Sequence, residues 1–204
     1  MYFLITAGGT REYIDPVRFI SNASSGKMGY ALSQAAFDAG DKVTLISASD
    51  MQPPVGVDFV GVESAKDMLD AVKKYFKECD CLIMAAAVSD YAPVRCSKTK
   101  IKKGHSNLII KLKPTADILA WSGRNKRKNQ IIVGFALEDK SLKTNAEKKV
   151  KAKHLDMIVA NKSDTIGADK TTVHIKTPGS KWVTVKDQKK SAIAKKIIEM
   201  IKKI

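Results

Sequence analysis

Two groups of residues with anion-binding chemistry follow the short apolar run Met1–Ile5. The first group is the glycine pair Gly8 and Gly9. The second is Asn22–Lys27, which combines an amide, two hydroxyls, a glycine and a lysine, and two arginines lie between the groups. Backbone N–H groups near glycines, hydroxyls and guanidinium groups bind phosphates and carboxylates. A loop this long between a strand and a helix is usually functional, so the sequence predicts an anion site here.

Two familiar nucleotide-binding motifs do not fit this loop. The dinucleotide fingerprint fails because a long insert separates its glycines. The second strand also ends at Ser47 without an acid to bind a ribose hydroxyl. The P-loop pattern fails because Ser21 replaces its first glycine and Met28 replaces its Ser/Thr. An NAD(P)-binding reductase of Rossmann type is therefore only an alternative.

The physical features of the loop remain without those templates. Asn22 and the following residues precede a helical segment, whose first N–H groups and dipole favour an anion. Ser24 and Ser25 would add hydroxyl donors, and Gly26 would let an anion approach the backbone. Alternatively, one serine is only an N-cap and Asn22 only a turn residue. Composition does not choose between these two interpretations.

The elements that must position these residues alternate along the chain. Hydrophobic patterning predicts strands at Tyr2–Ala7, Lys42–Ser47, Asp58–Val62, Cys81–Ala87, Leu108–Leu112, Ile131–Ala136 and Asp156–Ala160. It predicts helices at Gly29–Ala39 (ended by Gly40), Ala65–Phe76 (N-cap Ser64), Ala116–Trp121 (N-cap Thr115), Leu142–Lys153 and Ser191–Ile204. A hairpin is expected from Thr171–Ile175 and Trp182–Val185 around Pro178-Gly179.

This order predicts an α/β fold in one domain over residues 1–204. The expected architecture is a Rossmann-like, doubly wound, mainly parallel sheet with helices on both faces and a C-terminal β-hairpin.

The chain carries a net charge of +15, from 36 Lys and Arg against 21 Asp and Glu. The lysines are spread over several segments and are not interleaved with aromatics, as a base-stacking surface would require. Nucleic acid is therefore not expected as a partner, whereas small polyanionic substrates are. No apolar run approaches the roughly 20 residues of a membrane span, and no signal peptide is evident, so a cytoplasmic protein is expected.

The three cysteines, Cys79, Cys81 and Cys96, are odd in number and lack the spacing of a redox or zinc motif. We expect reduced, structural thiols. The three histidines are scattered and form no metal-ligand pattern.

The string ITAGGTREYIDPVRFISNASSGKMGYAL closely resembles the signature of phosphopantothenate–cysteine ligase, also called phosphopantothenoylcysteine synthetase, a family of coenzyme A biosynthesis. The resemblance continues, in the family's order and over nearly the whole chain, in Ala85–Tyr91, Lys100–Lys103, Asp117–Leu119, Val133–Ala136 and Lys149–Asn161. In many bacteria this ligase follows a flavin-dependent decarboxylase domain. The chain begins at the ligase's first strand, so the free-standing form, without flavin, is expected.

The resemblance implies a reaction in two steps. The carboxylate of 4′-phosphopantothenate attacks the α-phosphate of a nucleoside triphosphate, CTP in preference to ATP, and releases pyrophosphate. The amine of L-cysteine then attacks the acyl-nucleotide, giving 4′-phosphopantothenoylcysteine and the nucleoside monophosphate. Mg²⁺ is expected to neutralise the phosphates. Family members are typically homodimers, and the predicted hairpin is a candidate interface.

The resemblance also implies individual roles. Lys100 would bind the phosphates and stabilise charge in the first step. Asn22 would hold the acyl-nucleotide for attack by cysteine. Arg18 would orient Asn22 or contact the intermediate, or would only pair with the nearby Asp15. Lys149 would contact the nucleotide.

The full set of implied nucleotide-binding residues is Met84, Ala85, Ala86, Asp90, Lys100, Ala116, Asp117, Ile118, Leu119, Phe135, Lys149 and Lys153. The implied substrate-binding residues are Gly8, Gly9, Arg18, Asn22, Ser24, Ser25, Gly26, Lys27, Ala86 and Ala87. Ala116 departs from the family, which has proline there. From the residues alone, an exposed loop lysine is the favoured interpretation of Lys100. The Lys149/Lys153 pair can also be a solvated basic face, and a core role is equally good for Phe135. No acidic triad identifies the metal ligands, and an inactive nucleotide-binding homologue is the other alternative.

Overall fold

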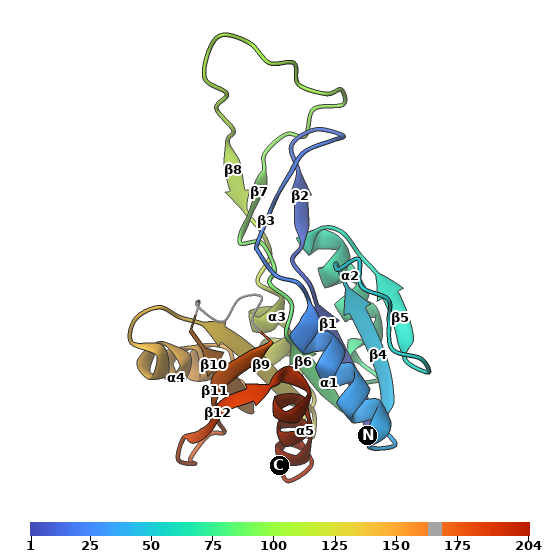
Figure 1. Ribbon diagram of the computed structural model, residues 1–204, viewed down its shortest axis with the longest axis vertical. Helices are drawn as coiled ribbons and strands as arrows, with labels where there is room; N and C mark the ends of the chain where they lie inside the picture. Colours follow the sequence, from blue (N-terminus) through green and yellow to red (C-terminus); the bar gives the residue numbers. More distant parts are fainter. Residues whose placement is uncertain (163–168) are drawn as a thin grey trace.

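The computed structural model describes residues 1–162 and 169–204. Over these residues the central sheet has eight strands, in the order β12-β11-β10-β9-β6-β1-β4-β5 (Figure 1). The parallel strands are β1 (Tyr2–Ala7), β4 (Lys42–Ser47), β5 (Asp58–Gly61), β6 (Cys81–Met84), β9 (Ile131–Leu137) and β10 (Met157–Asn161). A C-terminal hairpin of β11 (Lys170–Lys176) and β12 (Val183–Lys189) extends one edge in antiparallel fashion.

Helices cover both faces of this sheet. The helices α1 (Lys27–Asp38) and α5 (Lys190–Ile201) pack on one face. The helices α2 (Ala65–Phe76), α3 (Ile118–Asn125) and α4 (Leu142–Ala152) pack on the other. In β1, Phe3 and Ile5 face the first core and Leu4 faces the second. Because side chains alternate along a strand, burial on both faces gives the continuous apolar runs seen in the sequence. The predicted fold class is confirmed.

Several predicted element ends are confirmed. Ser64 caps α2 in a capping box, since its Oγ accepts from the Asp67 N–H at 3.1 Å and Asp67 Oδ2 accepts from the Ser64 N–H at 3.0 Å. Gly40 follows the end of α1 with φ +78°, a conformation that favours glycine. Most of the remaining parallel strands and helices form where they were predicted, and their bounds differ from the prediction mainly at the ends.

The region between β6 and α3 differs from prediction. The expected strand Leu108–Leu112 does not form, and Ile109 is 84% exposed. Parallel pairing of β6 with β9 leaves no place for this segment between them in the sheet. A short strand β8 (Leu112–Pro114) instead pairs with β7 (Tyr91–Pro93), apart from the sheet.

The expected helix Ala116–Trp121 begins later than predicted. Thr115 is not its N-cap, because the hydroxyl of that residue donates to the carbonyl of Ser89 at 2.6 Å. Asp117 caps α3 instead, with Oδ1 accepting from the Ala120 N–H at 2.9 Å.

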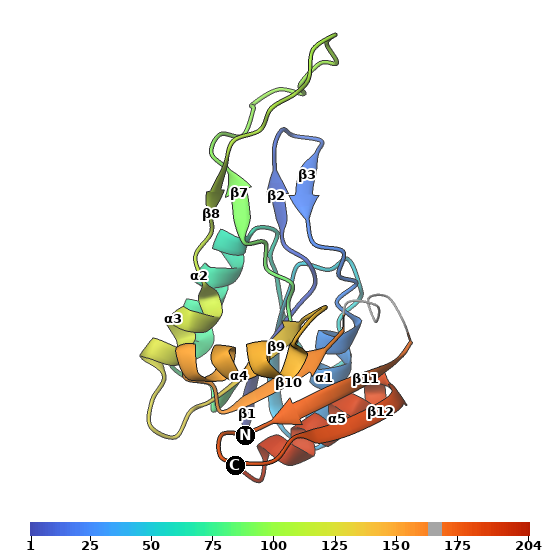
Figure 2. The ribbon, with the colours of Figure 1, turned by 90° about the vertical axis from the view of Figure 1, so that its left-hand side faces the viewer.

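Two antiparallel ribbons rise from the carboxyl end of the parallel strands (Figures 1 and 2). One is β7–β8, and the other is formed by β2 (Arg11–Tyr13) and β3 (Phe19–Ser21) inside the long loop after β1. We call them together the ribbon pair. Its exposed apolar side chains are Val17, Phe19, Ile20, Tyr91, Val94, Leu108, Ile109 and Leu112.

The cysteines are free, with Cys79 and Cys81 buried and Cys96 exposed. Burial raises the pKa of the Cys79 thiol to about 11, so this thiol stays protonated and unreactive near neutral pH. In the described part of the chain, no three His, Cys, Asp or Glu side chains are grouped as metal ligands. None of the described helices has the length and apolar character needed to cross a membrane.

Candidate active site

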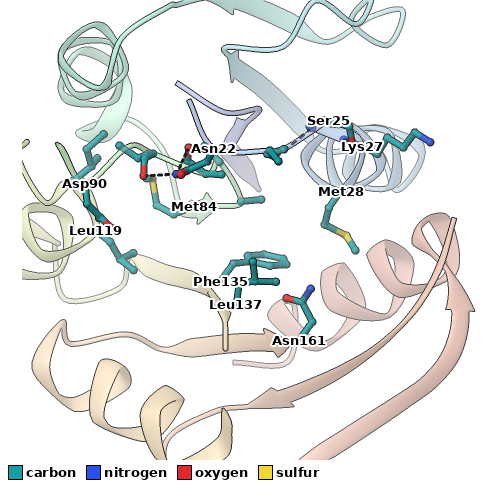
Figure 3. Close-up of a pocket in the computed structure, with 18 of the residues that line it drawn as sticks. Asn22, Ser25, Lys27, Met28, Met84, Asp90, Leu119, Phe135, Leu137 and Asn161 are labelled. Atoms are coloured by element: carbon teal, nitrogen blue, oxygen red, sulfur yellow. Dashed lines mark hydrogen bonds between the residues drawn. The ribbon is translucent and has the colours of Figure 1, made fainter. Parts of the chain in front are cut away.

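A cavity of about 570 Å³ lies at the carboxyl ends of β6, β9 and β10 (Figure 3). Parallel strands bring their carboxyl ends to one edge, where open α/β sheets bind ligands. Three loop segments supply most of the wall, namely Asn22–Met28, Met84–Val88 and Thr115–Leu119. The strand ends Phe135, Leu137 and Asn161 line its floor, as Figure 3 shows.

Hydroxyl groups join the loop after β1 to the loop after β6. Thr6 Oγ1 accepts from the Ala86 N–H at 3.2 Å, and Thr10 Oγ1 accepts from the Ser89 N–H at 2.9 Å. The Ala87 N–H donates to the Gly8 carbonyl at 2.8 Å. Thr6, Thr10 and Ser89 are buried, so their hydrogen bonds satisfy buried backbone groups that apolar packing would leave without partners. These hydrogen bonds therefore fix the positions of the two loops relative to each other where they line the cavity.

Asn22 bridges the same two loops at the cavity wall. Its Nδ2 donates to the carbonyl oxygens of Ala87 at 3.3 Å and Val88 at 3.1 Å (Figure 3). Since both donated bonds come from the amide nitrogen, this orientation leaves the carboxamide oxygen as the acceptor side. Asn22 is thus more than a turn residue, because it sets the distance between two cavity segments.

The beginning of α1 faces the cavity through a glycine cap. Gly26 is the N-cap, with φ +78°, so neither Ser24 nor Ser25 occupies that position. A Cβ at Gly26 would lie 3.0 Å from the Ser49 Cβ and 3.2 Å from the Gly8 nitrogen. The glycine therefore serves both a left-handed backbone and a close approach. The first N–H groups of α1 have no partners within the helix and can bind an anion in the cavity.

Two lysines at the end of the basic helix α4, Lys149 and the C-cap Lys153, also line the cavity. Lys149 donates from Nζ to the Phe135 carbonyl at 2.8 Å, and Lys153 pairs with Asp117 at 2.7 Å. Burial, and then the positive charge of Lys153, lowers the pKa of the Lys149 ammonium. Lys149 is therefore a desolvated cation, whose attraction for an anion is screened less than that of a surface lysine.

The structure brings most of the expected nucleotide-binding residues together. The cavity is lined by Met84, Ala85, Ala86, Asp90, Ala116, Asp117, Ile118, Leu119, Phe135, Lys149 and Lys153. The expected substrate-binding residues that line it are Asn22, Ser24, Ser25, Gly26, Lys27, Ala86 and Ala87. Lys27 lies at the rim, and its Nζ bonds to Asp169 at 3.2 Å.

Four expected residues do not line this cavity. Lys100 is exposed in the loop between β7 and β8. Arg18 pairs with Asp15, which confirms the expected structural partner. Gly8 and Gly9 lie behind the wall, and Gly9 borders a second cavity of about 580 Å³ on the other side of the Asn22 segment.

Sequence reasoning missed several lining residues. Asn161 could have been found, because it ends the parallel strand β10 next to the end of β9, and the ends of parallel strands converge. Lys190 and Thr171 carry no such signal, because only the antiparallel hairpin brings them to the cavity. The missed residues are Ala23, Met28, Val88, Thr115, Leu137, Asn161, Thr171, Val173 and Lys190.

A mainly parallel sheet with a cavity of mixed polar and apolar lining at its carboxyl edge, walled by a glycine-capped helix, defines a Rossmann-like ligand-binding domain. The chain belongs to the family of DNA/pantothenate metabolism flavoprotein C-terminal domains, whose model matches residues 1–204.

Three similar proteins support this assignment. A cysteine/cysteine sulfinic acid decarboxylase from an unknown prokaryotic organism is 49% identical over 166 residues, which are 80% of this chain and 46% of that protein. The coenzyme A biosynthesis bifunctional protein CoaBC of Bacillus subtilis is 46% identical over 169 residues, 82% of this chain and 41% of that protein. The crystal structure of a CoaBC C-terminal domain is 38% identical, with a TM-score of 0.85 over 98% of this chain and 93% of that one. The chain spans less than half the length of the two curated relatives.

Removing the charge of Lys153 should raise the pKa of Lys149. In Lys153→Met the repulsion from Lys153 is lost and Asp117 is released from its ion pair, and both changes favour the charged Lys149. The measurement is the NMR titration of the Lys149 Cε signal in the folded protein. Lys148→Met, an exposed neutralisation on the same helix, is the matched control and should leave the titration unchanged. A Lys149 pKa that stayed constant or fell in Lys153→Met would contradict this electrostatic account.

Proposed function

We propose that this chain is a ligase that joins 4′-phosphopantothenate to L-cysteine through an acyl-nucleotide intermediate. The observation that carries the proposal is the convergence of separate sequence segments on one cavity. The Asn22 loop, the Ala85 loop, the α3 start and the α4 lysines are far apart in sequence but share that cavity. Each segment also matches the ligase family in sequence.

The relatives lend support in different degrees. The Bacillus subtilis protein is named for coenzyme A biosynthesis, and the solved C-terminal domain of such a protein matches this chain over nearly its full length. The decarboxylase name belongs to a protein more than twice as long as the shared part, so we do not extend it to this chain. Absence of decarboxylation and of flavin stays a prediction.

The first step must bring a carboxylate to a polyphosphate against their mutual repulsion. We assign the nucleotide phosphates to the side of the cavity with Lys149 and Lys153, where the desolvated cation Lys149 and its neighbour Lys153 offset that repulsion. We assign the substrate's own phosphate to the N–H groups in the first turn of α1, beside the N-cap Gly26. The substrate carboxylate then lies between the lysines that bind the nucleotide phosphates and the helix start that binds the substrate's own phosphate. Attack on the α-phosphate forms the acyl–phosphate bond and releases pyrophosphate.

The second step needs the acyl-nucleotide to be held while cysteine approaches. Asn22 is fixed by two backbone carbonyls at the wall between these two ends, so its carboxamide is pre-oriented toward an intermediate. Attack by the cysteine amine forms the amide and releases the nucleoside monophosphate. The small side chains Ala85–Ala87 let the reacting chain lie close to the backbone.

The cavity fits Mg²⁺ that arrives with the nucleotide. Asp90 and Asp117 are its acidic lining residues in the described structure, and Asp117 is paired with Lys153. Mg²⁺ usually binds one or two carboxylates together with phosphates and several waters. We therefore propose Asp90 as the carboxylate that would hold it. When bound, the ion would neutralise phosphate charge and make pyrophosphate a better leaving group.

Two alternatives remain distinct from this proposal. A nicotinamide-dependent reductase would need a ribose-binding acid after the second strand, where Ser47 ends β4. An inactive homologue would need no lysines at the phosphate end, yet Lys149 and Lys153 both line the cavity. We expect the ligase, CTP as the preferred nucleotide and a cytoplasmic location.

The purified chain should release pyrophosphate from CTP when given 4′-phosphopantothenate, L-cysteine and Mg²⁺. We expect kcat/KM to be about tenfold or more higher with CTP than with ATP. Omitting 4′-phosphopantothenate is the control and should abolish release. No pyrophosphate with either nucleotide would refute the ligase, and binding of NADPH without binding of CTP would favour the reductase.

Asn22→Asp should let the acyl-nucleotide accumulate. A carboxylate at this position repels the phosphates and cannot donate to Ala87 and Val88, so attack by cysteine should slow about 100-fold. The measurement is quenched-flow detection of the intermediate together with product. Asn129→Asp, an exposed residue far from the cavity, is the matched control. A fully active Asn22→Asp variant would remove Asn22 from the mechanism.

We also propose a homodimer, formed through the ribbon pair rather than the C-terminal hairpin. The ribbon pair exposes eight large apolar side chains, including Val94 and Ile109, and such clusters mark interaction sites. Lys100 lies in the same region, outside the cavity of its own chain. For Lys100 to reach a bound nucleotide, either its loop moves or a second copy supplies it, and the apolar surface favours a second copy.

Light scattering should therefore give about twice the chain mass of 22.3 kDa. Replacing both Val94 and Ile109 by Glu should shift the protein to monomers, because charges would be buried in the interface. Val55→Glu is the matched control, since Val55 is 92% exposed in a loop before β5. A monomeric wild-type chain at micromolar concentration would contradict the dimer.

A further inference from the structure

The turn between β2 and β3 contains a carboxylate that contacts two distant segments of the chain. The Asp15 side chain is completely excluded from solvent. Its Oδ1 accepts from the backbone N–H groups of Val17 and Arg18, each at 2.9 Å. Its Oδ2 accepts from Arg18 Nε at 2.9 Å and from the Ile101 N–H at 3.1 Å. The carboxylate therefore joins its own turn to the loop between β7 and β8.

Two more hydrogen bonds strengthen this junction. A terminal nitrogen of the Arg18 guanidinium donates to the Ile101 carbonyl at 2.6 Å. The Ser97 N–H donates to the Ile14 carbonyl at 2.9 Å. The loop is thus held at two points, residues 97 and 101, and Lys100 lies between them.

An ionised carboxylate away from water needs several donors, and Asp15 has them. Hydrogen bonding to the Arg18 guanidinium holds the pKa of the Asp15 carboxyl well below its usual range. The junction is therefore already formed at neutral pH. The junction lies at the β2–β3 ribbon, which is separate from the eight-stranded sheet.

We propose that Asp15 and Arg18 are positioning residues that hold the Lys100 loop in place for the first step of the reaction. This inference rests on the proposed function, because it names how one residue of that site is presented. Arg18 thereby acts through the loop backbone and not by contact with the intermediate. The anchor holds the loop outside the cavity of its own chain, so it would present Lys100 to the site of a second copy.

Such an anchor would help because an exposed loop and its lysine side chain lose conformational entropy when they bind phosphates. Ordering a residue's backbone costs about 1–2 kcal/mol, and a long side chain costs more. If the loop backbone is already fixed at Ser97 and Ile101, only the Lys100 side chain remains to be ordered when the phosphates bind. A guanidinium suits this anchor, because its planar fork reaches the carboxylate and a carbonyl at once.

The first test reads the anchor without any substrate. Asp15→Asn leaves one acceptor oxygen where two served the turn and the loop, so one set of bonds is lost. NMR hydrogen exchange at the Ile101 N–H should accelerate by about tenfold or more, with the thermal midpoint nearly unchanged. Asp70→Asn, which removes the exposed Lys66–Asp70 pair on α2, is the matched control and should not alter exchange at Ile101. Unchanged exchange in Asp15→Asn would overturn the anchor.

The second test asks whether Asp15 acts through Lys100. Pyrophosphate release with CTP, 4′-phosphopantothenate, L-cysteine and Mg²⁺ is compared in Asp15→Asn, Lys100→Ala and the double variant. We expect Asp15→Asn to lower kcat about tenfold in the wild-type background and to cost nothing further in Lys100→Ala. Multiplicative effects in the double variant would overturn the positioning role. If Asp15→Asn does not fold, Arg18→Lys, which keeps the charge but not the fork, replaces it in both tests.

The two proposals can fail separately. If the wild-type chain releases no pyrophosphate with any nucleotide, the proposed function and the catalytic half of this inference are both wrong. Exchange at Ile101 would still decide whether Asp15 anchors the loop. If wild type is active and exchange at Ile101 does not respond to Asp15→Asn, the ligase stands and the anchor falls.

Discussion

The packing of α1 directly against β1 is the constraint on which the cavity depends. A Cβ at Gly29 would lie 2.5 Å from the Ala7 Cβ and 2.9 Å from the Thr6 carbonyl oxygen. Such distances are too short for real contacts, so only glycine lets the helix lie this close to the strand. This contact fixes the height of α1 above the sheet. Gly26, the N-cap of α1, and the first residues of the helix consequently line the cavity.

Hydrogen bonds from buried hydroxyl groups then hold together the loops that form the cavity wall beside this helix. Thr6 and Thr10 accept hydrogen bonds from the backbone of the loop after β6, and Asn22 donates to two carbonyl groups of the same loop. None of these three residues contributes to the apolar cores, which lie between sheet and helices. The chain therefore separates two tasks. Apolar packing gives stability, whereas hydrogen bonds among short polar side chains give the site its geometry.

The sequence predicts the elements that depend on local interactions well, and those that depend on long-range contacts poorly. Helix α2 and strand β4 have the predicted bounds, because Ser64 capping and β-branched residues act within a few positions. The ribbon pair was not predicted, since its three-residue strands pair through tertiary contacts that local patterning does not encode. Most cavity residues were placed by family resemblance. Lys190 could not be, because the turn of the hairpin decides where α5 begins.

Placement of charge, more than its amount, distinguishes this chain. Most of the net charge of +15 lies on solvated lysines, where each interaction is weak and screened. Lys149 is different, because burial beside the Phe135 carbonyl removes part of its hydration, and the attraction of an anionic ligand would offset that cost. Lys100 represents the opposite design, an exposed cation whose position depends on the hydrogen bonds around Asp15. The Lys149 ammonium is positioned by its own hydrogen bond to the Phe135 carbonyl, whereas the position of Lys100 depends on hydrogen bonds that its neighbours in the loop make to Asp15 and Arg18.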